Sequence, residues 1–314
     1  MARLTAGSFI ALTFVVCVTA AGTSCGFSPA SSSAPTPTPN PTVTTPLKYL
    51  FVFGDSYSTT GFNWTAAQPS PKNPIGNPAF PGVNTCGKND PNWVDYLLVK
   101  YNSTVTMGYD FAVSGATVDN ALIKNTVSFA DQVVQFTKGY TANGKPGGKL
   151  KSWTGANSAV AMWFGINDIG LTYMKSGDRL AFNDKILDKY FEQVRTLYTL
   201  GHRNFVFLNV PPVNRSPMMI SEKVGDKVKP IILNYNSKLA KRVATFKTNH
   251  PNAKVTLIDT HTVMRNLLNS PKKHGFKDAT TFSHTEKTVM WCNNYHISPG
   301  VHDFVARAVE PKLK

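Results

Sequence analysis

The chain reads Tyr49-Leu50-Phe51-Val52-Phe53 and then Gly54-Asp55-Ser56-Tyr57-Ser58. An apolar run of this length, rich in aromatic and β-branched side chains, is typical of a strand that is covered on both faces. Such strands occur in parallel sheets, where helices lie on both sides. The small and polar residues after the run predict a turn at the carboxyl end of the strand.

Further apolar runs of strand length follow, and helix-like segments lie between them. The predicted strands are 49–53, 109–113, 158–164, 204–210 and 254–258. The predicted helices are 92–100, 129–137, 178–200, 230–247, 262–268 and 299–309. This alternation predicts a single α/β domain of three layers (α/β/α), in which helices cover both faces of a mostly parallel, five-stranded sheet.

Small and polar residues follow three of these strands, at the sheet edge where crevices form. Ser56 follows the first strand, Gly115 the second and Asn167 the third, and His296 comes just before the last helix. Acyl transfer needs these residue types, because a serine hydroxyl becomes a good nucleophile when a nearby histidine removes its proton. A glycine N–H and an asparagine amide suit an oxyanion, since neither titrates. The set therefore predicts a serine hydrolase.

The segments around these positions resemble the four sequence blocks of the GDSL or SGNH hydrolase superfamily. They read Phe51-Val52-Phe53-Gly54-Asp55-Ser56, Tyr109-Asp110-Phe111-Ala112-Val113-Ser114-Gly115-Ala116-Thr117, Trp163-Phe164-Gly165-Ile166-Asn167-Asp168 and Tyr295-His296-Ile297-Ser298. The resemblance implies a flavodoxin-like fold, Ser56 as nucleophile, His296 as base, and Gly115, Asn167 and the Ser56 N–H as oxyanion donors. Within the superfamily the chain resembles secreted acetylesterases of carbohydrate esterase family 16, which implies acetyl esters on plant cell-wall sugars as substrates.

Two positions depart from the family pattern. Tyr57 stands where leucine usually follows the nucleophile, which leaves the nucleophile itself in place. Asn293 stands three residues before His296, where the family usually has aspartate. Asparagine carries no charge to stabilise imidazolium and can select the wrong tautomer. We expect a backbone carbonyl near Asn293 to accept the Nδ1 proton, as in superfamily members with a Ser-His dyad; a carboxylate from elsewhere is the alternative.

Three further residues near these blocks invite a functional interpretation. Asp55 precedes the predicted nucleophile, and we expect its side chain to fix the turn through hydrogen bonds to the backbone. Asp168 is expected to support the loop that carries the oxyanion donors. His302 is a rival to His296 as base, but its place inside the last predicted helix favours a structural or capping role.

The composition excludes several classes of protein. Of 314 residues, 42% are hydrophobic, 16% charged and 11% aromatic, and the mean hydropathy is -0.17. These values do not fit a fully disordered chain, a collagen-like fibre or a multi-span membrane protein. Lys and Arg total 33 against 18 Asp and Glu, a net charge of +15, which favours acidic partners such as acidic cell-wall polysaccharide. The basic residues are scattered without a recognisable motif, so nucleic acid is not expected as a partner.

The N-terminus predicts export from the cell. Arg3, an apolar core at 9–18 and small residues at 19–22 make up a secretory signal peptide, assigned to residues 1–22. The core is too short for a stable membrane span, which disfavours the alternative of an uncleaved anchor. A Pro-, Ser- and Thr-rich linker, open to O-glycosylation, is predicted at 23–46, and the hydrolase domain at 47–314.

Secretion bears on the cysteines. Removing the signal peptide removes Cys17 and leaves Cys25, Cys86 and Cys292, an odd number. An oxidising compartment would allow a disulfide between Cys86 and Cys292, with Cys25 free or in an intermolecular bond, although the sequence does not determine the pairing.

Secretion also bears on three Asn-X-Ser/Thr triplets, which begin at Asn63, Asn102 and Asn214. They fit the N-glycosylation pattern, and Pro217 weakens the third. A glycoprotein is therefore expected.

The residues predict a secreted serine esterase that forms an acyl-enzyme, and the resemblance implies acetyl esters of plant cell-wall carbohydrates as its substrates. No metal or other cofactor is expected, because no His, Cys and Asp set has the spacing of metal ligands. Two alternatives stay open. One is a GDSL lipase or phospholipase, which would need an apolar acyl groove, and the other is a catalytically impaired relative that binds glycans, an interpretation that Asn293 supports.

Overall fold

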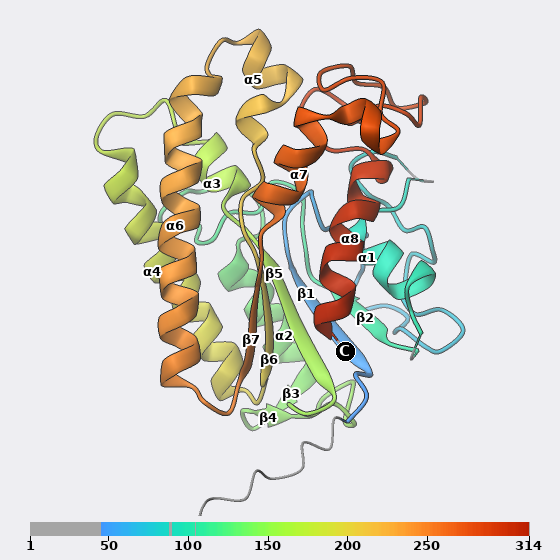
Figure 1. Ribbon diagram of the computed structural model, residues 1–314. Coiled ribbons are helices and arrows are strands. Elements are labelled where there is room, and N and C mark those ends of the chain that lie inside the picture. Colours follow the sequence, from blue (N-terminus) through green and yellow to red (C-terminus); the bar gives the residue numbers. More distant parts are fainter. Residues whose placement is uncertain (1–44, 88–89, 104, 314) are drawn as a thin grey trace, which may run out of the picture. The chain divides into compact units, whose positions relative to one another are not determined.

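Five parallel strands form the central sheet of the computed structural model, which describes residues 45–87, 90–103 and 105–313 (Figure 1). They are β1 (Tyr49–Gly54), β2 (Met107–Asp110), β5 (Ser158–Trp163), β6 (Asn204–Leu208) and β7 (Lys254–Ile258), in the spatial order β2-β1-β5-β6-β7. Every neighbouring pair is parallel, so the predicted sheet is confirmed. All residues of β1 and β5 are buried, as expected for strands covered on both faces.

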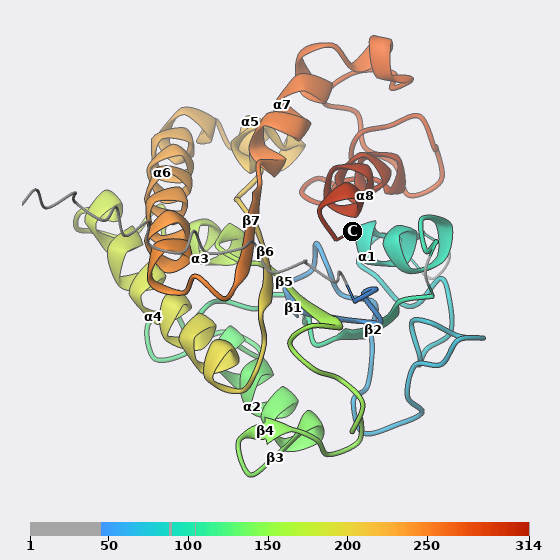
Figure 2. The ribbon, with the colours of Figure 1, turned by 60° about the horizontal axis from the view of Figure 1, so that its bottom comes forward.

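Helices cover both faces of the sheet and give the three predicted layers (Figures 1 and 2). One face carries α2 (Phe129–Tyr140), α4 (Arg179–Thr199) and α6 (Gly225–Asn249), which pack side by side. The other carries α1 (Trp93–Asp95), the π-helix η1 (Tyr96–Lys100), α7 (Thr260–Asn269) and α8 (Pro299–Leu313). Short elements complete the chain: α3 (Ile166–Gly170), α5 (Pro217–Ser221), the 3-10 helices η2 (Val213–Arg215) and η3 (Pro271–His274), and the hairpin β3 (Thr141–Ala142) with β4 (Lys145–Pro146).

The second strand lies earlier than the predicted range 109–113, since it begins at Met107 and ends at Asp110. Backbone bonds to β1 continue past this end, from the Phe111 N–H to the Val52 carbonyl at 2.8 Å and from the Val113 N–H to the Gly54 carbonyl at 3.2 Å. The Asp110 carboxylate bonds to the backbone at the same point. Its Oδ1 accepts from the Ala112 N–H at 3.0 Å, and its Oδ2 accepts from the Thr60 N–H at 2.8 Å. Gly115 therefore lies in a loop beyond the strand rather than directly at its end.

The helix predicted at 230–247 begins earlier, at Gly225, and ends at Asn249. Pro230 lies in its second turn, where a proline removes one backbone hydrogen bond. Val228 and Ile232, on either side of that position, are fully buried. Burial of this apolar face keeps the helix continuous through the proline.

The register of β1 and β5 brings two predicted blocks together. Gly54 at the end of β1 lies opposite Trp163 at the end of β5. The segments that follow, one with Ser56 and the other with Asn167, therefore leave the sheet side by side at its carboxyl edge.

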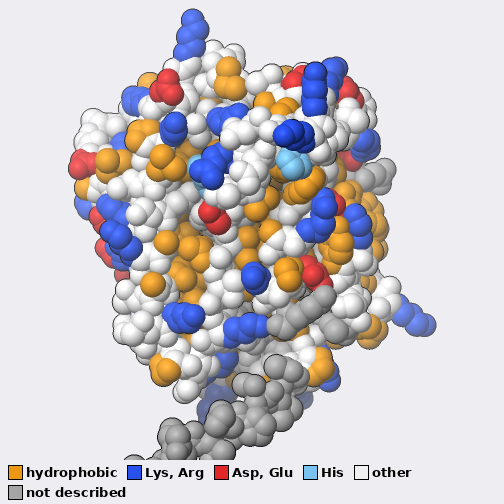
Figure 3. Space-filling model, viewed as in Figure 1, with side chains coloured by type: hydrophobic (Ala, Val, Ile, Leu, Met, Phe, Trp, Pro, Cys, Tyr) orange, Lys and Arg blue, Asp and Glu red, His pale blue; other side chains and the backbone are white. Residues whose placement is uncertain are grey.

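The predicted signal peptide at 1–22 and nearly all of the predicted linker at 23–46 lie outside the described residues. Within residues 45–313, apart from the positions not described, no helix combines the length and apolarity that crossing a bilayer requires. Lys and Arg side chains are scattered over the face seen in Figure 3 rather than gathered in one patch.

Candidate active site

Ser56 lies in a tight turn directly after β1, and Asp55 holds that turn. The Asp55 carbonyl accepts from the N–H groups of Ser58 and Thr59, both at 3.0 Å. The Asp55 carboxylate accepts from the Tyr57 N–H at 2.9 Å, which confirms the prediction that this side chain fixes the turn. Ser56 itself is only 7% exposed. Hydrogen bonds thus hold the backbone that carries the hydroxyl.

Gln132, a residue that the sequence did not single out, supports the same turn from α2. Its Nε2 donates to the Gly54 carbonyl at 2.8 Å, and its Oε1 accepts from the Gly54 N–H at 3.0 Å. Gln132 is fully buried on the apolar face of α2, next to Val133. A buried amide among apolar neighbours needs hydrogen-bond partners. The position of Gln132 on the apolar face of a predicted helix was therefore the sequence feature that could have indicated its role.

His296 reaches Ser56 from the other end of the chain. Its Nε2 lies 2.9 Å from the Ser56 Oγ, although the two residues are 240 positions apart. The segment that carries it is a small hairpin, in which Trp291 bridges Ile297 and the Cys292 N–H donates to the His296 carbonyl at 2.9 Å. The structure therefore brings the predicted nucleophile and the predicted base within hydrogen-bond reach.

Asn293 accepts the hydrogen bond from the His296 ring, so the expectation that a backbone carbonyl does so is wrong. Asn293 Oδ1 lies 3.1 Å from Nδ1 of His296. The same oxygen accepts from the N–H groups of Tyr295 at 2.9 Å and His296 at 2.8 Å. Because these donors face the oxygen, Nδ1 must carry the proton and Nε2 is free to accept from Ser56. The asparagine therefore sets the tautomer a general base needs, without supplying charge.

Burial lowers the pKa of His296 to about 4, so the imidazole is neutral across the mildly acidic range. A neutral ring is the form that can accept the Ser56 proton. We therefore expect kcat/KM for p-nitrophenyl acetate to fall as the pH drops through about 4 and to be level at pH 6. A midpoint near 6.5, the value of an exposed histidine, would contradict this assignment.

Gly115 presents a backbone N–H at the same edge. Its φ of +81° lies in the left-handed region, and a Cβ there would come within 3.0 Å of Asn125 Nδ2. That Nδ2 donates to the Gly115 carbonyl at 2.6 Å and fixes the orientation of the peptide. Within the described part of the chain, the N–H groups of Gly115 and Ser56 have no hydrogen-bond acceptor. Both are available to an oxyanion.

Asn167 lies in the first turn of α3, next to the nucleophile turn. Its Nδ2 donates to the Ala116 carbonyl at 2.9 Å and lies 3.3 Å from Asp55 Oδ2. To donate to a substrate oxygen, the amide must give up the longer of these two contacts, the one with Asp55 Oδ2. Gly165 precedes α3 with φ +113°, and a Cβ there would meet Tyr235 at 2.6 Å. Only glycine at this position lets α3 lie where it does.

Asp168 ties α3 to the loop that follows Gly115. Its Oδ1 accepts from the Val118 N–H at 3.0 Å, which confirms that it supports the loop of the predicted oxyanion donors. Burial raises the pKa of Asp168 to about 7, and burial raises that of Asp55 to about 7 as well.

His302 is not bonded to Ser56. It lies inside α8, 4% exposed, with its ring centroid 6.3 Å from that of Tyr57. Burial lowers the pKa of His302 to about 3. These features fit the structural role expected for it.

Cys86 and Cys292 form a disulfide, the pairing that the sequence left open. Cys25 lies outside the described residues. The bond joins the long loop after β1 to the hairpin of His296 and closes a loop of 206 residues.

Replacing Cys86 and Cys292 together with serine is expected to lower the free energy of unfolding by about 2–5 kcal/mol, because the unfolded chain regains the entropy of the open loop. Thermal unfolding of the double variant beside wild type measures the change. An unchanged Tm would contradict a structural role for the bond.

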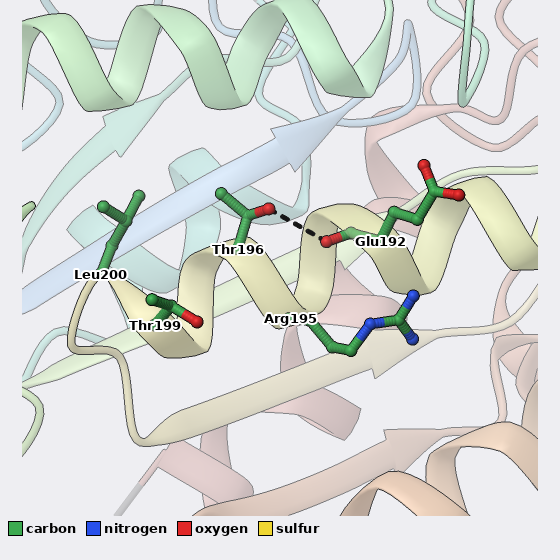
Figure 4. A pocket seen from close by; sticks show the side chains of 5 residues that line it. All are labelled: Glu192, Arg195, Thr196, Thr199 and Leu200. Atoms are coloured by element: carbon green, nitrogen blue, oxygen red, sulfur yellow. Dashed lines mark hydrogen bonds between the residues drawn. The ribbon is translucent and has the colours of Figure 1, made fainter. Parts of the chain in front are cut away.

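A hollow of about 420 Å³ lies at the end of α4 (Figure 4). It is lined by Glu192, Arg195, Thr196, Thr199 and Leu200. Because β6 starts shortly after α4 ends, this hollow lies toward the amino ends of the strands, opposite Ser56. In the part of the chain that the structure describes, no group of three His, Cys, Asp or Glu side chains could hold a metal ion.

A parallel sheet whose carboxyl edge joins a serine to a histidine is an arrangement that serine hydrolases use. A family model described as GDSL-like Lipase/Acylhydrolase matches residues 50–309. The chain therefore belongs to this family of ester-bond hydrolases.

Three proteins of known description are similar to this chain. The chain is 35% identical over 275 residues to an acetylesterase of Thermothelomyces thermophilus, covering 85% of this chain and 88% of that protein. It is 26% identical over 170 residues to an acetylesterase of Hypocrea jecorina, covering 52% and 47%. A solved acetylxylan esterase mutant from Geobacillus stearothermophilus is 12% identical, with TM-score 0.48, covering 86% of this chain and 96% of that one.

Proposed function

We propose that this esterase is secreted and removes acetyl groups from plant cell-wall carbohydrates through an acyl-enzyme on Ser56. The observation that carries the mechanism is the 2.9 Å contact between Ser56 Oγ and His296 Nε2, beside two unbonded N–H groups. The acetyl preference is supported by the 35% identical acetylesterase, which this chain covers over most of its length.

The proposed reaction has two steps of the same kind. Ser56 Oγ attacks the acyl carbon while Nε2 of His296 takes its proton. The oxyanion accepts hydrogen bonds from the N–H groups of Gly115 and Ser56 and from the Asn167 amide. The proton then passes from Nε2 to the departing sugar hydroxyl, which leaves an acetyl ester on Ser56. Water, activated by the same nitrogen, releases acetate and restores the serine.

The test compares p-nitrophenyl esters of short and long acyl chains, with wild type and Ser56→Ala. Strong preference for the acetyl ester supports the proposal. Preference for long chains would contradict it in favour of a lipid esterase, and equal rates for both proteins would contradict the use of Ser56. Acetate release from acetylated xylan then tests the carbohydrate substrate directly.

A lipid esterase is the second candidate, favoured by exposed apolar side chains near the site. Leu171 follows α3 and is 46% exposed, Met174 is 63% exposed, and Ile220 of α5 is 48% exposed. α5 abuts the hairpin of His296, because the Met218 N–H donates to the Asn294 carbonyl at 2.8 Å. Long acyl chains could pack against such side chains, and the assay above decides between the two functions.

Export and glycosylation are part of the proposal. Of the three triplets, Asn63 is exposed, whereas Asn214 is buried. Asn102 uses its Nδ2 to donate to the carbonyls of Leu98 and Thr106. Asn63 is therefore the acceptor that suits a folded glycoprotein. A loss of mass at Asn63 on enzymatic deglycosylation of the exported protein would support this, and a glycan on Asn214 would contradict it.

The basic charge is proposed to hold the enzyme near acidic wall polysaccharide. With 33 Lys and Arg against 18 Asp and Glu, retention on a polygalacturonate column should weaken steadily as salt rises, since ions screen exposed charges. An acetylated dextran column serves as the uncharged control. Retention that does not change with salt would contradict this expectation.

A further inference from the structure

Tyr57 reaches from the nucleophile turn to the segment that carries His296. Its hydroxyl donates to the Tyr295 carbonyl at 2.6 Å, across 238 positions of sequence. Tyr295 directly precedes His296, so this bond joins the two segments that supply the nucleophile and the base. Tyr57 is 1% exposed, and burial raises its pKa well above the usual value. The hydroxyl therefore stays protonated and keeps its role as donor.

The rest of Tyr57 is held as firmly as its hydroxyl. Its N–H donates to Asp55 Oδ1 at 2.9 Å. Its ring centroid lies 5.5 Å from that of Trp163, edge to face, and 5.5 Å from that of His296. The side chain is thus fixed at its base, along its ring and at its tip, with the imidazole packed against it.

Hydrogen bonds within the hairpin determine its shape, while the bond from Met218 to Asn294 and the Cys86–Cys292 disulfide attach it to other segments. Asn293 Oδ1 accepts from the N–H groups of Tyr295 and His296, and Cys292 donates to the His296 carbonyl. All of these residues belong to the hairpin. The Tyr57 bond differs because it begins in the nucleophile turn.

We propose that Tyr57 is a positioning residue for the general base, holding the Tyr295 carbonyl and the imidazole so that Nε2 stays within reach of Ser56. This inference rests on the proposed serine esterase function. It gives a reason for the departure from leucine, which would pack here without donating. Hydrogen bonds to a charged group are roughly twice as strong as neutral ones. With neutral Asn293, the Tyr57 bond supplies orientation that an aspartate would otherwise give.

Tyr57→Phe tests the hydroxyl alone, since the ring is kept. We expect kcat on p-nitrophenyl acetate to fall about tenfold with KM within about twofold, less than the roughly 10²-fold that a 1 Å misplacement can cost. Tyr57→Leu, the usual family residue, should lose at least as much. The matched control is Tyr190→Phe, because the Tyr190 hydroxyl is buried and has no partner within the described residues. Its kcat should equal that of wild type.

The Asn293→Asp background shows whether Tyr57 positions His296 or only stabilises the fold. In that background a charge-assisted bond orients the imidazole, so Tyr57→Phe should lower kcat by less than about threefold. An equal loss in both backgrounds, or a lower Tm with unchanged kcat, would overturn the proposal.

A second readout needs no ester substrate. The rate at which a fluorophosphonate labels Ser56 should fall about tenfold in Tyr57→Phe, because labelling needs the same oriented base. A tenfold fall in labelling in a protein that hydrolyses no ester would support the role of Tyr57 and refute the proposed function. Normal labelling beside normal hydrolysis would refute the role of Tyr57 and leave the function standing.

Discussion

Replacing Ser56 with alanine is expected to lower kcat on p-nitrophenyl acetate by about 10⁶-fold, the scale of nucleophile loss in other serine hydrolases. The physical reason is that no acyl-enzyme can form, while the oxyanion donors stay in place. KM should change little, since the substrate still meets the same surface. The residual rate over the uncatalysed reaction should come from those donors alone.

Ser152→Ala is the control for this experiment. The Ser152 hydroxyl is bonded to the Tyr49 hydroxyl at 2.7 Å, at the amino end of β1 and so at the opposite edge of the sheet. This variant loses a serine hydroxyl and one hydrogen bond, and should keep the kcat of wild type. If Ser56→Ala kept more than about a tenth of wild-type activity, another residue would have to be the nucleophile.

Replacing Asn167 with alanine is expected to lower kcat by about 10²- to 10³-fold, the usual cost of removing one oxyanion donor. The amide now lies between the Ala116 carbonyl and the Asp55 carboxylate, beside the nucleophile turn. Steady-state kinetics should show the loss in kcat rather than in KM, because the donor is needed where negative charge develops.

Asn204→Ala provides the matched control for Asn167. Asn204 Nδ2 also donates to two acceptors, the carbonyls of Gly155 at 3.0 Å and Ser158 at 2.8 Å, but at the amino end of the sheet. Its loss should lower Tm without changing kcat. If both asparagine variants lowered Tm alike and kept full kcat, Asn167 would have only a structural role.

The fold was predictable because its strands are long apolar runs. β1 and β5 read as continuously buried segments, and the order of elements along the chain implies helices on both faces. The end of β2 was predicted less well, since the apolar run continues to Val113, and backbone bonds to β1 continue with it beyond the last residue of the strand. The five-residue helix α3 is too short for a period of 3.6 to show.

The residues of the site could be predicted from the sequence, but the hydrogen bonds between them could not. Four blocks placed Ser56, Gly115, Asn167 and His296 in chain order, and strand ends gave a reason for three of them to meet. What orients His296 was predicted wrongly, because the direction of the Asn293 amide is set by two hairpin N–H groups that the sequence does not reveal.

Asn293, a neutral acceptor for the His296 ring, affects how that histidine acts as a base. An aspartate would stabilise imidazolium by charge, whereas Asn293 orients the ring and fixes its proton on Nδ1. Burial of His296, which lowers its pKa to about 4, keeps the base neutral but makes it a weaker one. The imidazole therefore stays neutral at pH values at which an exposed histidine would already be protonated.

Covalent labelling tests the central claim, that Ser56 and His296 act as nucleophile and base. The folded protein is treated with diisopropyl fluorophosphate, and peptide mass spectrometry locates the adduct while esterase activity is followed. We expect one adduct, on Ser56, whose formation parallels the loss of activity and is far slower in His296→Ala. Full hydrolytic activity after complete labelling of Ser56, or an adduct on another residue that tracks inactivation, would contradict it.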